Sequence, residues 1–110
     1  MADHIKGVAP SALDERIASA GEKLVLAYLW GPDCPNCLIF KRSLPKLLEQ
    51  LTDIRVEVLE VDVYAHPEVA TRYGVHGIPH FLLFKHGKKL GKMSEFRGEK
   101  YWLDVIREHA

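Results

Sequence analysis

The chain has 110 residues, the size of one compact domain, so we expect residues 1–110 to form a single domain in which residues 1–10 are a loosely ordered N-terminal segment. Its 47% hydrophobic and 27% charged residues are typical of folded globular proteins and exclude the disordered and fibrous classes. Fifteen basic residues balance fifteen acidic ones, and this net charge of zero indicates neither nucleic acid nor an anionic membrane as a partner.

The expected compartment follows from the apolar segments and the cysteines. The longest apolar run, residues 24–30, is far shorter than the roughly 20 residues that cross a bilayer. The opening residues lack the apolar core of a secretory signal, so we expect a cytoplasmic protein without a membrane partner. The chain has two cysteines, Cys34 and Cys37. In a reducing cytosol such a close pair indicates redox or metal chemistry rather than a structural bridge.

The first half of the chain predicts two helices and two strands. Ser11 resembles a helix N-cap, so a first helix is expected over residues 12–20. Residues 24–30 are continuously apolar, which predicts a central strand covered on both faces. Apolar residues at three- and four-residue spacing predict an amphipathic helix over residues 35–51. A second central strand is expected over residues 55–63.

The second half predicts a short helix, a hairpin and a closing helix. The short helix is expected over residues 66–73, with a proline in its first turn. Strands over 81–85 and 88–96 flank a His-Gly turn, the pattern of an antiparallel hairpin. A helix with one apolar face is expected over 99–109. The order of these elements predicts an α/β fold, a mixed sheet with helices on both faces.

The cysteine pair falls where the long helix begins. A thiol at a helix N-terminus meets free backbone amides and the positive end of the helix dipole, which lower its pKa, so Cys34 is the predicted attacking thiol. Cys37 lies one turn further along, on the inner side, and is the predicted resolving thiol. Pro35 suits the first helical turn and stiffens the loop. An alternative is a zinc site completed by two of His66, His76 and His80.

Three stretches of the chain resemble successive landmarks of the thioredoxin family: residues 30–37 (WGPDCPNC), 72–79 (RYGVHGIP) and 81–87 (FLLFKHG). The resemblance covers most of the chain. It implies the thioredoxin fold, a central mixed sheet of four to five strands flanked by helices on both faces. It also implies dithiol exchange with disulfide-containing protein substrates, a thioredoxin reductase or another dithiol donor as partner, and a monomer. No cofactor is implied beyond a redox-active Cys34–Cys37 disulfide.

The resemblance also assigns substrate-binding roles. Pro79 matches the cis-proline that lies beside the dithiol in the family, and an X-Pro bond adopts the cis form at small energetic cost. Ile78 matches the residue whose backbone receives the substrate strand. Trp30 matches the tryptophan that packs under the active-site loop.

Several residues near the dithiol depart from the family pattern. Pro35-Asn36 stands between the cysteines in place of Gly-Pro, and proline after the nucleophile favours a more oxidising couple. Asp33 stands in place of tryptophan, and its carboxylate disfavours the neighbouring thiolate. We expect Asp33 to be a solvated loop residue that also caps the helix.

Two further departures concern proton transfer. Tyr28 stands where the family has a buried aspartate, with Val58 at the place of a lysine on the next strand, and a tyrosine is a poor base at neutral pH. His80 follows the predicted cis-proline and is either a titrating group near the dithiol or a solvent-exposed residue without a role. Together these departures predict a divergent thioredoxin-like protein.

The sequence thus predicts a thioredoxin-like protein-disulfide reductase with Cys34 attacking and Cys37 resolving. Two alternatives stay open. The couple could be that of a disulfide oxidase or isomerase, which a reduction potential distinguishes. The chain could also be a peptide-binding module that uses the groove around Ile78 and Pro79, with an incidental dithiol.

Overall fold

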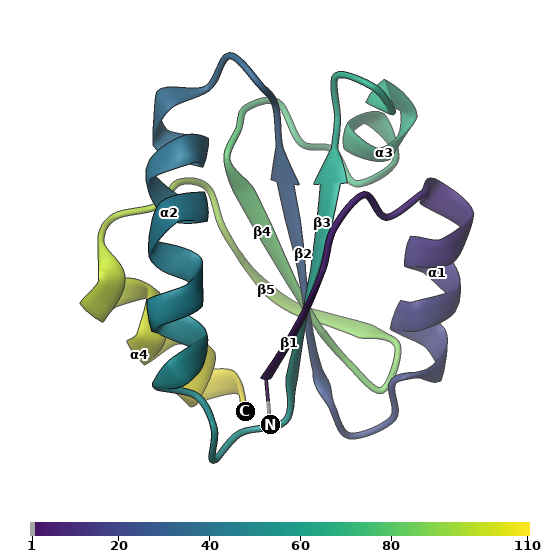
Figure 1. The fold of residues 1–110 in the computed structure, drawn as a ribbon. Helices are drawn as coiled ribbons and strands as arrows, with labels where there is room; N and C mark the ends of the chain where they lie inside the picture. The colour runs from purple at the N-terminus through teal and green to yellow at the C-terminus, as the bar shows by residue number, and fades with distance from the viewer. Residues whose placement is uncertain (1) are drawn as a thin grey trace.

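The computed structural model describes residues 2–110, in which five strands form one mixed sheet in the order β1-β3-β2-β4-β5 (Figure 1). The strands are β1 (Ala2–Ile5), β2 (Leu24–Trp30), β3 (Val56–Asp62), β4 (His80–Lys85) and β5 (Lys88–Met93). The helices are α1 (Pro10–Ser19), α2 (Pro35–Glu49), α3 (Pro67–Arg72) and α4 (Glu99–His109). Strands β1, β3 and β2 run parallel, whereas β4 is antiparallel to both β2 and β5. The predicted thioredoxin fold is confirmed.

The central strand β2 is apolar throughout because both of its faces are buried. Leu24, Leu26 and Tyr28 belong to one hydrophobic core, and the alternate residues Val25, Ala27 and Leu29 belong to the other. Helices α2 and α4 cover the first face of the sheet, and α1 and α3 cover the second (Figure 1). The period of two along a strand explains this division, since successive side chains point to opposite faces.

The N-terminal segment is more ordered than the sequence predicts. Residues 2–5 form β1, an edge strand that pairs in parallel with β3, with Ala2 beside Val56 and Ile5 beside Leu59. The expectation of a loosely ordered segment over residues 1–10 is therefore wrong for β1. An edge strand of four residues is held by main-chain pairing, which leaves no alternating apolar pattern for sequence analysis to detect.

Helix α1 starts earlier than predicted. It begins at Pro10 with Ala9 as the N-cap, and the predicted cap Ser11 lies inside the first turn. Proline is well suited to this position because its fixed φ fits the helix and the N–H it lacks has no helical acceptor there.

No helix within residues 2–110 is long and apolar enough to cross a membrane.

Candidate functional site

Cys34 and Cys37 lie where the central strand passes into α2. Strands β2 and β3 point toward the same end of the molecule, where the loop after β2 leads into α2 (Figure 1). As predicted, Cys34 lies at the N-terminus of α2 and Cys37 in its first turn; Cys34 is itself the N-cap residue. The two residues form a disulfide, with their Cα atoms 5.2 Å apart. The predicted capping role of Asp33 is wrong, because the cap position belongs to Cys34; Asp33 is exposed in the preceding loop.

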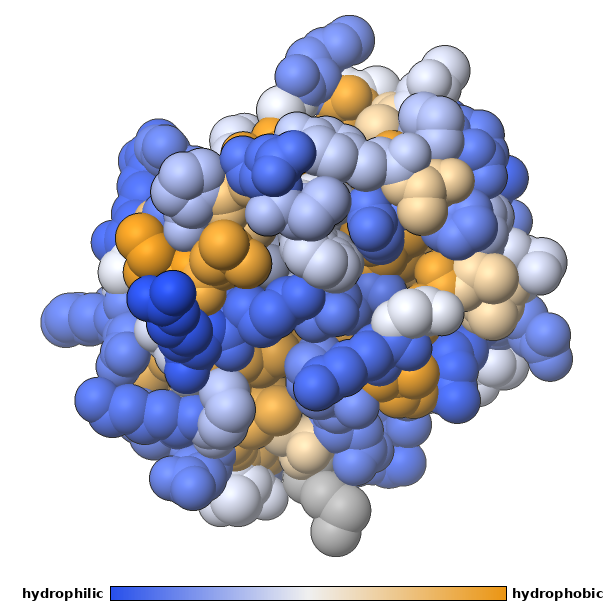
Figure 2. All heavy atoms as spheres, turned by 45° about the horizontal axis from the view of Figure 1, so that its top comes forward, coloured by the Kyte–Doolittle hydropathy of each residue, from blue (hydrophilic) through white to orange (hydrophobic). Residues whose placement is uncertain are grey.

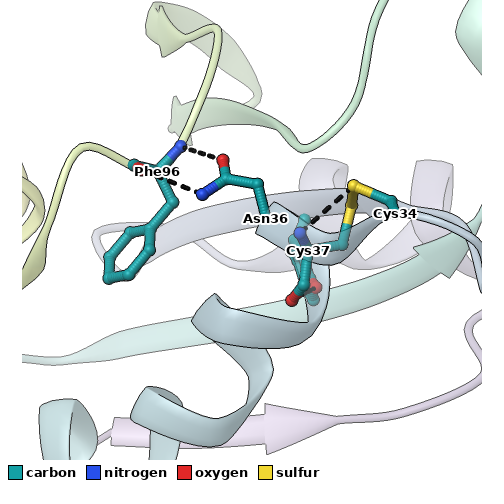
Figure 3. Close-up of a disulfide and its surroundings, with 5 residues drawn as sticks. Cys34, Asn36, Cys37 and Phe96 are labelled. Carbon is teal, nitrogen blue, oxygen red and sulfur yellow. Dashed lines mark hydrogen bonds between the residues drawn. A yellow bond between two sulfur atoms is a disulfide. The ribbon is translucent and has the colours of Figure 1, made fainter.

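The two cysteine residues differ in exposure. Cys34 is 8% exposed, whereas Cys37 is completely buried. The backbone N–H of Cys37 donates a hydrogen bond to Sγ of Cys34 at 3.1 Å (Figure 3). The same N–H would stabilise a Cys34 thiolate, since a donor to the charged form lowers a thiol's pKa. The geometry therefore suits attack by Cys34 and resolution by Cys37.

The side chain of Asn36 links this first turn to another part of the chain. Its Nδ2 donates to the carbonyl oxygen of Phe96 at 3.2 Å, and its Oδ1 accepts from the N–H of Phe96 at 3.1 Å (Figure 3). Phe96 lies in the loop of residues 94–98 between β5 and α4. The predicted strand 88–96 instead ends at Met93, because the following residues turn toward α2. Sequence analysis assigned Asn36 a modulating role without finding this contact.

The peptide bond between Ile78 and Pro79 is cis, as expected. This turn packs directly against the loop that precedes Cys34. A Cβ atom at Gly31 would come within 2.8 Å of both the Ile78 Cδ1 atom and the Tyr64 ring. A side chain at position 31 would therefore force the Ile78 or Tyr64 side chain to move. Ile78 also lines a groove of about 280 Å³, together with Tyr64, Val75 and His76. Tyr64 is 56% exposed, so its aromatic ring forms part of the groove surface, which sequence analysis missed.

On the end of the molecule that carries this groove and the dithiol loop, apolar residues form separate patches divided by polar side chains (Figure 2).

Tyr28 is completely buried beneath the first turn of α2. Its hydroxyl donates a hydrogen bond of 2.8 Å to the carbonyl oxygen of Cys37. Burial first, and then the negative charge of Glu60, raise the pKa of Tyr28 far above its ordinary value. The hydroxyl thus keeps its proton and shares it in a hydrogen bond with the carbonyl oxygen of Cys37. Tyr28 is a structural donor and not a base for Cys37.

A buried carboxylate stands beside Tyr28 on the neighbouring strand. Glu60 pairs with Tyr28 in the β2–β3 register and is 4% exposed. Its Oε1 lies 3.2 Å from Nε2 of His4, and its Oε2 lies 3.5 Å from Nζ of Lys41. The Lys41 ammonium also lies 3.2 Å from the centre of the Trp30 ring. Trp30 thus makes a cation–π contact with Lys41 and packs against the hydrophobic core on the α2 side of the sheet.

Sequence analysis missed this ionic cluster, although one signal was present. Glu60 is a charged residue within a strand whose positions 56–61 are all buried. A buried carboxylate needs a partner, so the pattern required cations nearby. The partners of Glu60 are His4 on β1 and Lys41 on α2, and no local pattern connects these two elements to β3.

His80 lies at the start of β4, directly after the cis-proline, and is 8% exposed. The expectation of a solvent-exposed side chain is therefore wrong. Burial, followed by the positive charges of Lys92 and Lys89, lowers the pKa of His80, so the ring stays neutral at neutral pH. A role for His80 in titration near the dithiol stays a prediction.

The zinc alternative has no structural support. Within residues 2–110 no three His, Cys, Asp or Glu side chains come together in a group that could hold a metal ion. His66 instead lies 3.6 Å from Glu68, and His76 lines the groove beside Ile78.

Comparison with known proteins adds a family assignment to this geometry. The thioredoxin family model matches residues 4–108. The thioredoxin of Sus scrofa is 37% identical over 89 residues, 81% of this chain and 83% of that protein. The thioredoxin of Bacillus subtilis is 28% identical over 92 residues, 84% of this chain and 88% of that protein.

A solved structure shows the same arrangement of elements. The crystal structure of Fasciola hepatica thioredoxin superimposes with a TM-score of 0.81 over 91% of this chain and 93% of that one, at 24% identity. At this identity the likeness supports the fold alone.

Proposed function

Because this chain belongs to the thioredoxin family, we propose that it is a thiol-disulfide oxidoreductase that reduces disulfides in protein substrates. The observation that carries the proposal is the placement of the cysteine pair. Cys34 caps α2 and receives the Cys37 N–H on its sulfur, while Cys37 is completely buried beside it. Cys34 is thus stabilised as a thiolate nucleophile, while burial keeps Cys37 away from other reactants until the mixed disulfide forms.

The proposed reaction starts from the reduced dithiol. The Cys34 thiolate attacks one sulfur of the substrate disulfide, forming a mixed disulfide and releasing the first substrate thiolate. Cys37 then loses its proton and attacks Cys34 Sγ, which breaks the mixed disulfide and releases the second substrate thiolate. The substrate gains two electrons and, with two protons, becomes a dithiol. The protein is left with the Cys34–Cys37 disulfide seen in the structure.

The proposal includes roles for the residues around the dithiol. Ile78 would offer its backbone to an extended substrate segment beside Pro79, and Trp30 would support the loop beneath it. A thioredoxin reductase or another dithiol donor would regenerate the reduced pair. We place this activity in the cytoplasm and in a monomer without a bound cofactor, and each of these assignments stays a proposal.

The reduction potential of the Cys34–Cys37 couple tests the direction of the reaction. The protein is equilibrated in glutathione buffers and its free thiols are trapped and counted. A value near or below the cytosolic glutathione poise, about −220 to −260 mV by extraction, supports a reductase. A value well above it contradicts net reduction and indicates an oxidase or isomerase. If no reversible couple forms, the enzyme proposal fails and a peptide-binding module remains.

Single cysteine variants test the roles of the two thiols. Cys34→Ser should abolish reduction of a model disulfide protein such as insulin, because the attacking sulfur is gone. Cys37→Ser should still attack but should accumulate a mixed disulfide, because resolution is lost. Mass spectrometry of the trapped adduct reads out both results. Retained turnover in Cys34→Ser would contradict the assignment.

A further inference from the structure

The amide of Asn36 uses both of its ends on one residue that lies 60 positions later in the chain. Its donor meets the carbonyl oxygen of Phe96 and its acceptor meets the N–H of Phe96. Only one orientation of the amide satisfies both, since the flipped amide would set donor against donor and acceptor against acceptor. The pair of bonds therefore fixes the side chain in position and in rotation.

The same loop is also held by packing one turn further along α2. The Phe96 ring is buried, and its centre lies 5.1 Å from that of Phe40 on α2. The loop of residues 94–98 thus contacts α2 through a backbone pair at Asn36 and through an aromatic pair at Phe40. Asn36 is therefore hydrogen-bonded to a loop whose other contact with α2, the Phe96–Phe40 ring pair, involves neither cysteine.

The peptide unit that follows Asn36 carries the N–H that matters for Cys34. Pro35 has no N–H, and the donor to Cys34 Sγ is the N–H of Cys37, in the peptide group that joins Asn36 to Cys37. Neither bond between Asn36 and Phe96 involves sulfur, and the amide points away from the disulfide toward Phe96 (Figure 3). Reduction of the disulfide therefore leaves both bonds free to persist.

We propose that Asn36 is a positioning residue, which, by pairing with Phe96, holds the Cys37 N–H against Cys34 Sγ when the disulfide is open. This inference rests on the proposed dithiol chemistry. In the oxidised protein the S–S bond restrains the first turn of α2. In the reduced protein the Asn36–Phe96 pair takes over this restraint, so the thiolate keeps its donor and Cys37 stays in reach of Cys34.

The test compares Asn36→Ala and Asn36→Leu with the unmodified protein in the reduced state. Leucine has a similar shape without the amide, so any effect shared by both variants reports on the hydrogen bonds. We expect the pH midpoint of Cys34 alkylation to rise by about 0.5 to 1 pH unit, because the thiolate loses its donor for part of the time. The plateau rate at high pH should stay the same, since exposure of the sulfur is unchanged.

Ile39→Ala is the matched control. Ile39 lies on the same stretch of α2 and is 51% exposed, so its truncation should leave the midpoint in place. Every variant keeps all charged and titratable side chains, including those on the dithiol loop, α2, the neighbouring strands and the Phe96 loop: Tyr28, Asp33, Lys41, Glu60, His80, Glu95 and Arg97. A midpoint that is unchanged in both Asn36 variants, or that shifts equally in Ile39→Ala, overturns the proposal.

A measurement on the unmodified protein covers the case in which a variant fails to fold. NMR hydrogen exchange of the Asn36 side-chain amide should be slow in both the oxidised and the reduced protein. Rapid exchange on reduction would overturn the proposal, because the pair would then not replace the disulfide. These readouts need no substrate. Unmodified protein that cannot reduce a protein disulfide would contradict the proposed function, whereas a normal enzyme with unaffected Asn36 variants would contradict this inference alone.

Discussion

At the scale of single residues, two hydrogen-bond donors act on the cysteine pair and the first turn of α2. The Cys37 N–H is directed at Cys34 Sγ, and the Tyr28 hydroxyl is directed at the Cys37 carbonyl oxygen. The raised pKa of Tyr28 keeps that hydroxyl protonated across the physiological range. The proton of Cys37 must therefore pass to water or to a group other than Tyr28. The tyrosine hydroxyl holds the first turn of α2 through its hydrogen bond.

Replacing Tyr28 with phenylalanine should separate structure from catalysis. Tyr28→Phe removes one buried hydrogen bond, and we expect the free energy of unfolding to fall by about 0.5–1.5 kcal/mol. The rate of disulfide reduction should stay within about twofold, because the hydroxyl accepts no proton in the reaction. Urea unfolding and insulin reduction measure the two effects.

Tyr73→Phe is the control for this change, since the Tyr73 hydroxyl donates a long, exposed hydrogen bond of 3.5 Å to Asp14. A large loss of turnover in Tyr28→Phe with little loss of stability would show that the hydroxyl does take part in proton transfer.

At the scale of elements, α2 carries both the chemistry and the packing that supports it. Its first turn holds the cysteines, and its inner face sets Phe40 against Tyr28 and Phe81 at ring-centre distances of 4.7 Å each. Lys41, on the side of the helix facing β3, spans Glu60 and the Trp30 ring. One helix thus positions the dithiol, closes the core and neutralises the buried carboxylate.

The double contact of Lys41 predicts a stability effect that a surface lysine would not show. Lys41→Met keeps the apolar stem but takes the ammonium group away from Glu60 and from the Trp30 ring. We expect the free energy of unfolding to fall by about 1–3 kcal/mol. Lys46→Met, on the same helix, alters an exposed pair with Glu99 and should cost less than about 0.5 kcal/mol.

Urea denaturation of both variants gives the comparison. Equal losses for Lys41→Met and Lys46→Met would mean that the ionic cluster at Glu60 contributes no more than a surface ion pair.

At the scale of the whole molecule, the sheet carries another buried titratable group, His80, at the end where the cis-proline turn meets β4. Burial and the nearby Lys92 and Lys89 lower the pKa of His80 in the folded protein. An unfolded chain has no such environment, and its histidine titrates near the ordinary value of about 6.5. Folding and proton binding at His80 are therefore opposed.

The sign of the pH dependence follows from this difference. Between the lowered folded pKa and about 6.5, the unfolded chain binds more protons than the folded one. The free energy of unfolding should therefore fall as the pH drops below about 6.5, and this loss should level off below the folded pKa. His80→Gln, which cannot take up the proton, should lose less stability than the unmodified protein between pH 7 and pH 5.

Urea midpoints at the two pH values measure the effect, with His76→Gln, an exposed histidine, as the control. An identical pH dependence in His80→Gln and in the unmodified protein would contradict a lowered pKa at this position.

Much of the fold was predictable from local patterns. The continuous apolar run of β2 required helices on both faces, and the His-Gly turn fixed the hairpin of β4 and β5. The spacing of the cysteines and the start of α2 placed Cys34 at the N-terminus of the helix and Cys37 one turn further along, although the cap itself was assigned to Asp33. These features depend on residues close together in the chain, where periodicity and turn chemistry act directly.

The tertiary structure decided the features that depend on distant segments. Strand β1 forms because the edge of β3 offers it main-chain partners, and Glu60 is tolerated because β1 and α2 bring His4 and Lys41 to it. Asn36 meets Phe96 because the loop after β5 turns back onto α2. Local patterns were enough for the family resemblance, the order of the elements after β1 and the position of the dithiol. Only folding determined which groups lie around that dithiol, because contacts such as His4–Glu60 and Asn36–Phe96, whose partners are 56 and 60 residues apart, leave no local pattern in the chain.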